Sequence, residues 1–514
     1  MNAPDDRPPI LGLDLGTSTC LACVIWEGRP RFIRPDIYYR APGKKELDYP
    51  GDVMPSAFCF RDGQSLVGHR ALNELTDPRY AGDVVQQVKR MMKEEGSDLR
   101  IYSEGKPFTP ARITGEYVKV LVRAAEIELG LEQGTIKKAV ATVPATFGSK
   151  EQAATVKACV DYGGLREVEL IDEPVAAAYS MGLHEQPGRR RVLVVDLGGG
   201  TFDLTLWDVG KGAGPRGFAE LGRDGDSELG GLDWDREIAD WTLRASQPRF
   251  PEAVFERLMR EPTDYGHAKL FQACEVAKLT LSMQMKGQGL ADPAQPIDPR
   301  RLESMHIAFR PSTEPGEVER SADMPSEIFL KQNQRLLKQC IHVCERLFHD
   351  IQTIRRLERF GWADIDCVYL AGGGSRLPTV QRRFAEAWGS PPVLDENPQH
   401  AVARGAALLA ELWRQGQNLP GFVGKVRYKR SIGLLVRSRS EEAKPKFHPI
   451  IPRNQELPFD RSEFLPIVGD PNKASLCPLW YCGESDLPLN RAGGRLAPRV
   501  ETFPWQDRPG PRGS

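Results

Sequence analysis

The stretch RVLVVDLGGGTFDLTLWD, residues 191–208, decides the fold of this chain. Its apolar start at 192–195 predicts a buried strand that ends in Asp196, and 204–207 predict a second strand. The turn between the two strands contains Gly198, Gly199, Gly200 and Thr201. Successive glycines let backbone N–H groups approach an anion, and the acid can hold a hydrated divalent metal beside that anion. The stretch therefore predicts a phosphate-and-metal cradle, although most glycine turns between strands are simple hairpins.

A second copy of this pattern favours the cradle. Residues 10–15, ILGLDL, form another apolar strand with Asp14 near its end, and Gly16, Thr17 and Ser18 follow. DLGTST at 14–19 and DLGGGT at 196–201 share the order Asp, Leu, Gly, small residues, Thr. Two such hairpins far apart in one chain predict two similar half-domains that face one nucleotide. Each half would offer a turn to the phosphates and an acid to the metal.

Composition restricts the partners and the location of the chain. Its 514 residues suffice for several domains, and 69 basic against 70 acidic residues predict neither a nucleic acid nor an anionic membrane as a partner. The N-terminal MNAPDDRPPI has no signal-peptide pattern, and no apolar run is long enough to span a bilayer, so we expect a cytoplasmic protein.

Ten scattered cysteines predict reduced thiols and not a disulfide framework. We expect Cys20 and Cys23 to be packed thiols inside a strand, and Cys340 and Cys344 to share one helix face. Neither these pairs, nor Cys477 with Cys482, nor the eight histidines show the spacing of a metal site.

The region before the central stretch alternates helices and strands. We expect a short helix over 84–92 whose Lys89 and Arg90 form a solvated face, an amphipathic helix over 113–129, and a strand from 138 into a turn at Pro144. Ser149 with Gln152 predicts a capping box, and a strand over 168–171 leads to a helix that starts at Glu173. Glu173 is either an acid favoured by the helix dipole or a buried acid aimed at the nucleotide.

The region after the central stretch continues the alternation. A glycine turn at 228–235 opens a helix, 264–286 and 326–360 are helical, and 291–326 are loop and edge strand. Residues 367–378 predict a strand, a glycine turn and a helix, which is a nucleotide-facing arrangement. Asn397 followed by Pro398 predicts the start of a further helix. The whole pattern predicts an α/β protein.

Nine motifs in order resemble the heat-shock protein 70 family over residues 9–412. They are LGLDLGTS, VKRMM, ATVPATF, IDEPVAAAY, VVDLGGGTFDL, ELGGLDWD, ACEVAKLTLS, LAGGGSRLP and NPQHAVARGAA. The resemblance implies an actin-like ATPase domain, with duplicated ribonuclease-H-like halves around a nucleotide cleft, over 1–414. A linker at 415–430, a shortened β-rich domain like the family's peptide-binding domain at 431–500 and a disordered tail at 501–514 would follow, with short strands expected at 431–436 and 479–482. No helical lid is recognisable.

The resemblance also implies a role for individual residues. Asp14, Asp196 and Asp203 would hold hydrated Mg²⁺, and K⁺ is a further candidate ion. Lys89 would reach the γ-phosphate and the attacking water, with Glu173, Asp196 and Thr201 as the other catalytic residues. The phosphate turns would contain Gly16, Thr17, Ser18, Gly198, Gly199, Gly200 and Thr201. Contacts to ribose and adenine would come from Gly230, Gly231, Glu275, Lys278, Ser282, Gly372, Gly373 and Arg376.

Three positions depart from the family pattern. The arginine that stacks on adenine falls at Leu279, and the arginine that partners the switch proline falls at Gln152, while Pro144 is kept. Residues 421–430, GFVGKVRYKR, are basic where the family linker is acidic and leucine-rich.

The resemblance implies a Mg²⁺-dependent, ATP- and ADP-binding chaperone of extended apolar segments, served by a J-domain co-chaperone and a nucleotide exchange factor. The departures favour a second hypothesis, a nucleotide-dependent switch or scaffold with one dedicated protein partner. An actin-like filament or a sugar kinase fits less well, because neither would combine VPATF and IDEP segments with a β-rich tail.

Overall fold

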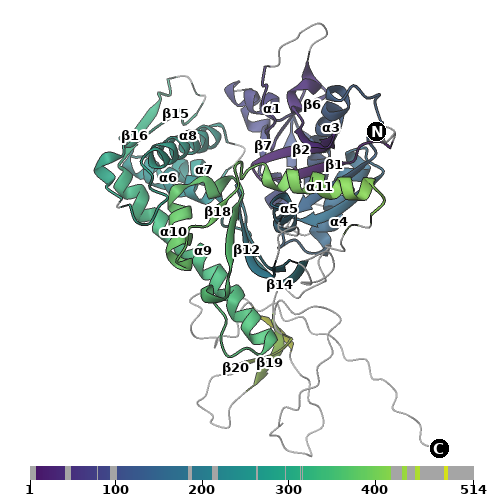
Figure 1. The fold of residues 1–514 in the computed structure, drawn as a ribbon. Coiled ribbons are helices and arrows are strands. Elements are labelled where there is room, and N and C mark those ends of the chain that lie inside the picture. The colour runs from purple at the N-terminus through teal and green to yellow at the C-terminus, as the bar shows by residue number, and fades with distance from the viewer. Residues whose placement is uncertain are drawn as a thin grey trace, which may run out of the picture. The chain divides into compact units, whose positions relative to one another are not determined.

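The computed structural model describes most of the chain up to residue 419 and three strands beyond it. The described residues are 7–40, 48–77, 79–92, 101–182, 188–210, 218–261, 264–295, 297–312, 314, 316–417 and 419, with 431–436, 446–451 and 480–483. They separate into two compact units, 1–348 with 360–423, and 349–359 with 424–514. The first unit contains the duplicated fold (Figure 1).

The first sheet is built around the hairpin at the start of the chain. Its strands run in the order β11-β10-β1-β2-β3, and β4 pairs with β2. Their bounds are β1 Leu11–Leu15, β2 Thr19–Trp26, β3 Arg29–Phe32, β4 Met54–Pro55, β10 Lys138–Val143 and β11 Glu167–Asp172. The pairs β1–β2 and β2–β3 are antiparallel, whereas β10 runs parallel to β1 and to β11.

The second sheet repeats this topology. Its order is β14-β13-β12-β17-β18, with β12–β13 and β13–β14 antiparallel and β17 parallel to both β12 and β18. Its strands are β12 Arg190–Leu197, β13 Phe202–Val209, β14 Phe218–Asp226, β17 Cys367–Ala371 and β18 Val393–Leu394. In each sheet a three-strand meander is extended from its first strand by two parallel strands. The predicted α/β fold with duplicated halves is therefore confirmed, and we call the two sheets with their helices the first and second halves.

Helix α11, Ala401–Arg414, packs on strands of the first half and on helix α5, Glu173–Ser180 (Figure 1). A Cβ on Gly405 would lie 1.7 Å from the Ala176 carbonyl oxygen, and one on Gly12 would lie 2.2 Å from the Ala407 backbone nitrogen. The close approach of α11 to α5 and β1 therefore requires glycine at both contacts.

The remaining elements surround the two sheets. In the first half they are β5 Ala57–Arg61, β6 Gln64–Val67, α1 His69–Asn73, β7 Val85–Gln86, α2 Val88–Met91, β8 Ile101–Ser103, β9 Lys106–Phe108, α3 Pro110–Glu128 and α4 Ser149–Lys157. In the second half they are α6 Gly231–Ala245, α7 Glu252–Arg260, α8 Tyr265–Gly287, β15 Met305–Phe309, β16 Arg320–Met324, α9 Ser326–Arg355 and α10 Pro378–Trp388.

Four predicted boundaries were wrong. The helix expected over 84–92 is the single turn α2, because Gln87 adopts a left-handed conformation and Val85–Gln86 pair as a strand. Helix α4 is capped at Gly148, whose N–H donates to Glu151 Oε2, and not at Ser149 with Gln152. Helix α11 starts at Ala401, since Asn397 forms only a turn whose carbonyl accepts the His400 N–H. Helix α9 ends at Arg355 and not near 360.

The second compact unit contains a small antiparallel sheet. Its strands β19 Ser431–Val436, β20 Lys446–Ile451 and β21 Trp480–Gly483 are arranged in the order β20-β19-β21. Strand β19 coincides with the predicted strand at 431–436, and β21 lies one residue beyond the prediction for 479–482. Most of the predicted linker at 415–430 and the whole predicted tail at 501–514 lie outside the described residues.

The cysteines follow the prediction where they are described. Eight of them are free, and Cys20, Cys23, Cys340 and Cys344 are buried. Cys477 and the side chain of Cys482 lie outside the described part of the chain. No helix among the described residues is both long and apolar enough to cross a bilayer.

Candidate functional site

The two glycine turns of the hairpins pack against each other. In the second turn the Gly198 N–H donates to the Thr201 carbonyl at 2.9 Å. A Cβ on Gly199 would lie 2.1 Å from Ser18 Oγ, and one on Gly200 would lie 2.5 Å from Thr17 Cγ2. Side chains at these glycines would push the turns apart, so glycine is what lets both turns face one cleft.

A cavity of about 280 Å³ opens between the two turns. Most of the predicted site residues line it: Asp14, Gly16, Thr17, Ser18, Lys89, Glu173, Asp196, Gly198, Gly199, Thr201, Gly231, Glu275, Lys278, Ser282, Gly372, Gly373 and Arg376. The predicted residues Gly200, Gly230 and Asp203 are not part of the lining. A Cβ on Gly230 would lie 2.6 Å from Gly200, and Asp203 is the cross-strand partner of Asp196, so all three support residues that do line the cavity.

The phosphate end of the cavity concentrates buried charge. Lys89 Nζ donates to Glu173 Oε1, and the two side chains are only 9% and 8% exposed. Glu173 is the first residue of helix α5, and it is also buried and lines the cavity, so both interpretations of this acid hold. Asp14 on β1 and Asp196 on β12 line the same cavity, and Asp203 on β13 is fully buried. Four carboxyl groups therefore surround one amine.

Burial shifts the protonation of this cluster. Burial first, and then the charge of Glu173, raise the pKa of Asp14 and of Asp203 to about 7 and that of Asp196 well above its usual value. Burial by itself would lower the pKa of the Lys89 amine, but the charges of Glu173 and Asp14 raise it above 10.5. When ionised, the four carboxyl groups carry more negative charge than the Lys89 amine balances, and a cation would favour this ionised form.

The donor set suits a hydrated hard cation. Asp203 Oδ2 is buried without a hydrogen-bond partner, and its Oδ1 accepts the Thr146 N–H at 3.3 Å. Among the described residues no three His, Cys, Asp or Glu side chains are close enough to ligate a metal directly. Carboxylate oxygens are the ligands that a hard cation such as Mg²⁺ prefers, and such an ion keeps several of its waters.

Helix α8 and the turn after β17 form the other end of the cavity. Glu275, Lys278 and Ser282 lie on one face of α8, at the i, i+3, i+7 spacing. Lys278 Nζ donates to the Gly231 carbonyl at 3.0 Å and to Asp235 Oδ2 at 2.8 Å, which ties α8 to α6. Arg376 donates to Asn397 Oδ1.

Gly372 joins this end of the cavity to the Asp196 carboxylate. Its φ is +78°, and a Cβ there would lie 2.3 Å from Asp196 Oδ1. Gly372 therefore allows the β17 turn to contact the carboxylate.

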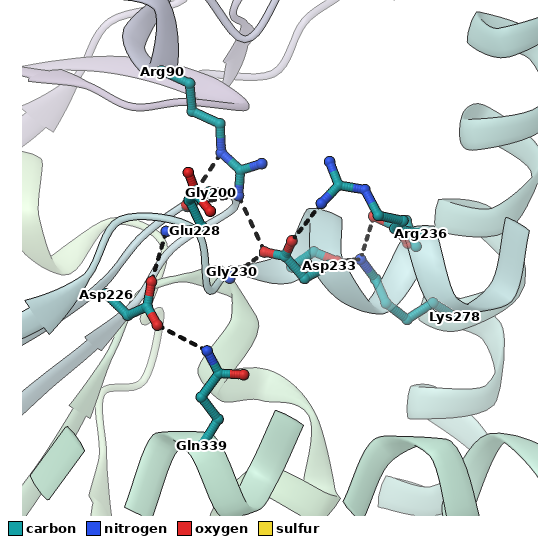
Figure 2. Close-up of polar contacts among 11 residues, drawn as sticks. Arg90, Gly200, Asp226, Glu228, Gly230, Asp233, Arg236, Lys278 and Gln339 are labelled. Carbon is teal, nitrogen blue, oxygen red and sulfur yellow. Dashed lines mark hydrogen bonds and ion pairs between the residues drawn. The ribbon is translucent and has the colours of Figure 1, made fainter. Parts of the chain in front are cut away.

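The turn that precedes α6 is fixed by its own hydrogen bonds. Asp226 accepts the Glu228 N–H at 2.9 Å and Gln339 Nε2 at 2.8 Å (Figure 2). Farther along, the Gly230 N–H donates to Asp233 Oδ2 at 2.8 Å, which closes the first turn of α6. These bonds hold Gly230 and Gly231 at the edge of the cavity.

Two of the three departures from the family pattern, Leu279 and Gln152, lie among the described residues, whereas 421–430 lie outside them. Leu279 lines the cavity and is 51% exposed, with Val276 and Met283 exposed on the same helix. Gln152 Nε2 donates to the Phe147 carbonyl at 3.3 Å, and the Phe147 N–H donates to the Pro144 carbonyl at 3.0 Å. The amide of Gln152 therefore holds the turn that follows Pro144.

Several lining residues were not predicted. Asp235 lines the cavity and pairs with Lys278, but no role of its own was predicted for it beyond membership of the motif ELGGLDWD. Its position as an acid inside a nucleotide-binding motif could have indicated such a role. Leu377, Pro398, Gln399 and Val402 line the cavity from loops and from α11, and their only signal was membership of the motifs LAGGGSRLP and NPQHAVARGAA.

Two matched halves that enclose glycine turns and a buried acid–lysine cluster define an actin-like nucleotide-binding ATPase. The sequence model of the Hsp70 protein family matches residues 10–475. The chain belongs to the Hsp70 family, whose members are ATP-dependent chaperones.

Curated relatives agree with this assignment. The chain is 29% identical to "Chaperone protein DnaK" of Metamycoplasma hominis over 93% of its own length and 70% of the relative. It is 29% identical to the protein of that name from Mycoplasmopsis agalactiae, over 95% of its own length and 73% of the relative. It is 30% identical to the protein of the same name from Thermotoga maritima, over 90% of its own length and 68% of the relative.

Proposed function

We propose that the cleft binds ATP with Mg²⁺ and hydrolyses it through the buried acid–lysine cluster. One observation supports this most strongly: four carboxyl groups and Lys89 converge beside two glycine turns that come from different halves. Asp14, Asp196 and Asp203 would hold the hydrated ion, and K⁺ is a further candidate for the same excess of negative charge. Mg²⁺, when bound, neutralises charge on the phosphates.

Phosphoryl transfer needs positioning and charge stabilisation more than covalent chemistry. Backbone N–H groups of the turns containing Gly16 and Gly199 orient the phosphates, while Lys89 donates to the γ-phosphate and Glu173 fixes the position of its amine. Thr201 is buried and lines the cavity, and its side chain lowers the pKa of Asp203. These residues would orient the attacking water at the end of the cavity where Lys89 and Glu173 are buried.

The chaperone activity of the family acts on unfolded polypeptides and involves co-chaperones. For this chain we propose extended apolar segments as clients, with a J-domain co-chaperone and a nucleotide exchange factor as partners. The supporting features are the family match through residue 475 and the three-stranded sheet β20-β19-β21, of which strands β19 and β20 lie within the match and β21 follows it. The same proposal includes an ATPase domain over 1–414 and a β-rich domain over 431–500. It also includes a cytoplasmic location, because the described cysteines are free thiols.

A test compares wild type with Asp196→Asn in single-turnover ATP hydrolysis over a range of Mg²⁺ concentrations. We expect the variant to be at least about tenfold slower, because one charged group of the ion site is lost. Asp208→Asn is the matched control: Asp208 is a buried carboxylate of β13 that pairs with Arg189 and does not line the cavity. Turnover in Asp196→Asn equal to that of Asp208→Asn would refute the assignment of the site.

A second measurement addresses the chaperone part. Steady-state ATP turnover of the full chain is measured with and without a short, extended, apolar peptide. Stimulation supports coupling between peptide binding and hydrolysis, whereas turnover that ignores the peptide favours the nucleotide-dependent switch or scaffold with one dedicated partner.

A further inference from the structure

Arg90 crosses from one half of the fold to the other. It lies on α2, next to Lys89, where a solvated charged pair was expected from the sequence. Its Nη2 donates to the Gly200 carbonyl at 2.8 Å and to Asp233 Oδ2 at 3.1 Å, and its Nε donates to the same carbonyl at 3.2 Å. Figure 2 shows the side chain reaching both partners, and it is only 17% exposed. The expectation of a solvated Arg90 is therefore wrong.

Both partners of Arg90 are structural parts of the cleft. Gly200 belongs to the second phosphate turn, where a Cβ would lie 2.8 Å from Arg90 Nε and 2.5 Å from Thr17 Cγ2. Asp233 closes the first turn of α6 through the Gly230 N–H. A single guanidinium thus holds the first half against both the phosphate turn and the α6 helix start of the second.

The contact extends to the opposite end of the cavity. Helix α6 also provides the Gly231 carbonyl and the Asp235 carboxylate, which both accept from Lys278 of α8. Arg90 itself does not line the cavity, whereas Lys278 does. Arg90 therefore acts on a nucleotide only through the elements that it holds.

We propose that Arg90 is a positioning residue that keeps the cleft closed and thereby slows the release of bound nucleotide. Its guanidinium donates to the Gly200 carbonyl and Asp233 at the same time, which the point charge of a lysine cannot reproduce. Release requires the halves to separate at the phosphate turns, and separation breaks both contacts. This inference rests on the proposed function, because it concerns nucleotide bound in the same cavity.

The test measures release of a fluorescent ADP analogue by stopped flow, after mixing with excess unlabelled ATP. We expect Arg90→Ala to release the analogue at least about tenfold faster, because loss of a buried charged contact acts mainly on the dissociation rate. Arg90→Lys should fall between the alanine variant and wild type. The single-turnover hydrolysis rate of bound ATP should change less than the release rate.

The chain offers a matched control on the same carboxylate. Arg236 Nη1 donates to Asp233 Oδ1 at 3.1 Å, but it lies on α6 itself and crosses no cleft. We expect Arg236→Ala to leave the release rate unchanged. In the Asp233→Asn background, Arg90→Ala should have a smaller effect than in wild type, since the ionic partner is already gone.

Two outcomes would overturn the inference. If Arg90→Ala and Arg90→Lys release the analogue no faster than Arg236→Ala does, Arg90 does not control release, while the proposed function stands as long as Asp196→Asn lowers hydrolysis. If wild type binds no adenine nucleotide, both the inference and the proposed function fail. Circular dichroism melting of each variant shows whether faster release accompanies a folded chain.

Discussion

Replacing Lys89 by methionine separates the structural role of the lysine from its role in hydrolysis. Methionine preserves the length of the side chain but removes the only amine among the four carboxyl groups. Glu173 then remains buried without its ion-pair partner. Removing one member of a buried pair typically costs about 3–5 kcal/mol. We expect the ligand-free protein to lose stability of this order.

A second substitution tests the cause of that loss. Glu173→Gln in the Lys89→Met background removes the unpaired charge, so most of the stability should return. Hydrolysis should not return, because the double variant still lacks the amine that we propose to contact the γ-phosphate. We expect single-turnover rates at least about tenfold below wild type in both variants.

Chemical denaturation gives the free energies of unfolding, provided that all variants share one slope of free energy against denaturant concentration. Rapid-quench analysis of pre-bound ATP gives the hydrolysis rates. Wild-type turnover in Lys89→Met would refute the role assigned to the amine. A double variant no more stable than Lys89→Met would show that the carboxylate of Glu173 is not the source of the penalty.

Three further predictions concern single features of the fold. Leu279→Arg should tighten ADP binding several-fold in a calorimetric titration, because it places a planar cation where the base would lie; unchanged or weaker affinity would contradict the position assigned to α8. Burial raises the pKa of Asp235 to about 6 in the folded chain, above its usual 3.8. The folded state therefore binds this proton more tightly than the unfolded state does, and the stability that the proton contributes is lost as pH rises from about 4 through 6. Asp235→Asn should flatten this dependence of the free energy of unfolding on pH, which a series of denaturation curves at different pH values measures. Gly405→Ala should cost about 1–3 kcal/mol or more, because its Cβ would meet the Ala176 carbonyl oxygen, whereas Gly287→Ala, with nothing within 4 Å, should leave the melting temperature nearly unchanged.

The two hairpins could be predicted because their signals are local. An apolar strand, an acid and a glycine turn lie within about ten residues of each other, and backbone preferences act over that range. The same logic identified the turn after β17 and the helix that follows it. Helix starts were less certain, since Gly148 and Ser149 are adjacent and only the Glu151 hydrogen bond distinguishes them.

The sequence by itself determined the duplicated strand–turn–strand pattern, and with it the fold class and the position of the two glycine turns. Only the tertiary structure decided which charges meet. Whether Glu173 is buried stayed open until Lys89, 84 residues earlier in the chain, was found beside it. Arg90 looked solvated, yet its partners Gly200 and Asp233 lie 110 and 143 residues away. Periodicity and turn chemistry report neighbours along the chain, whereas burial and ion pairing depend on segments that meet only after folding.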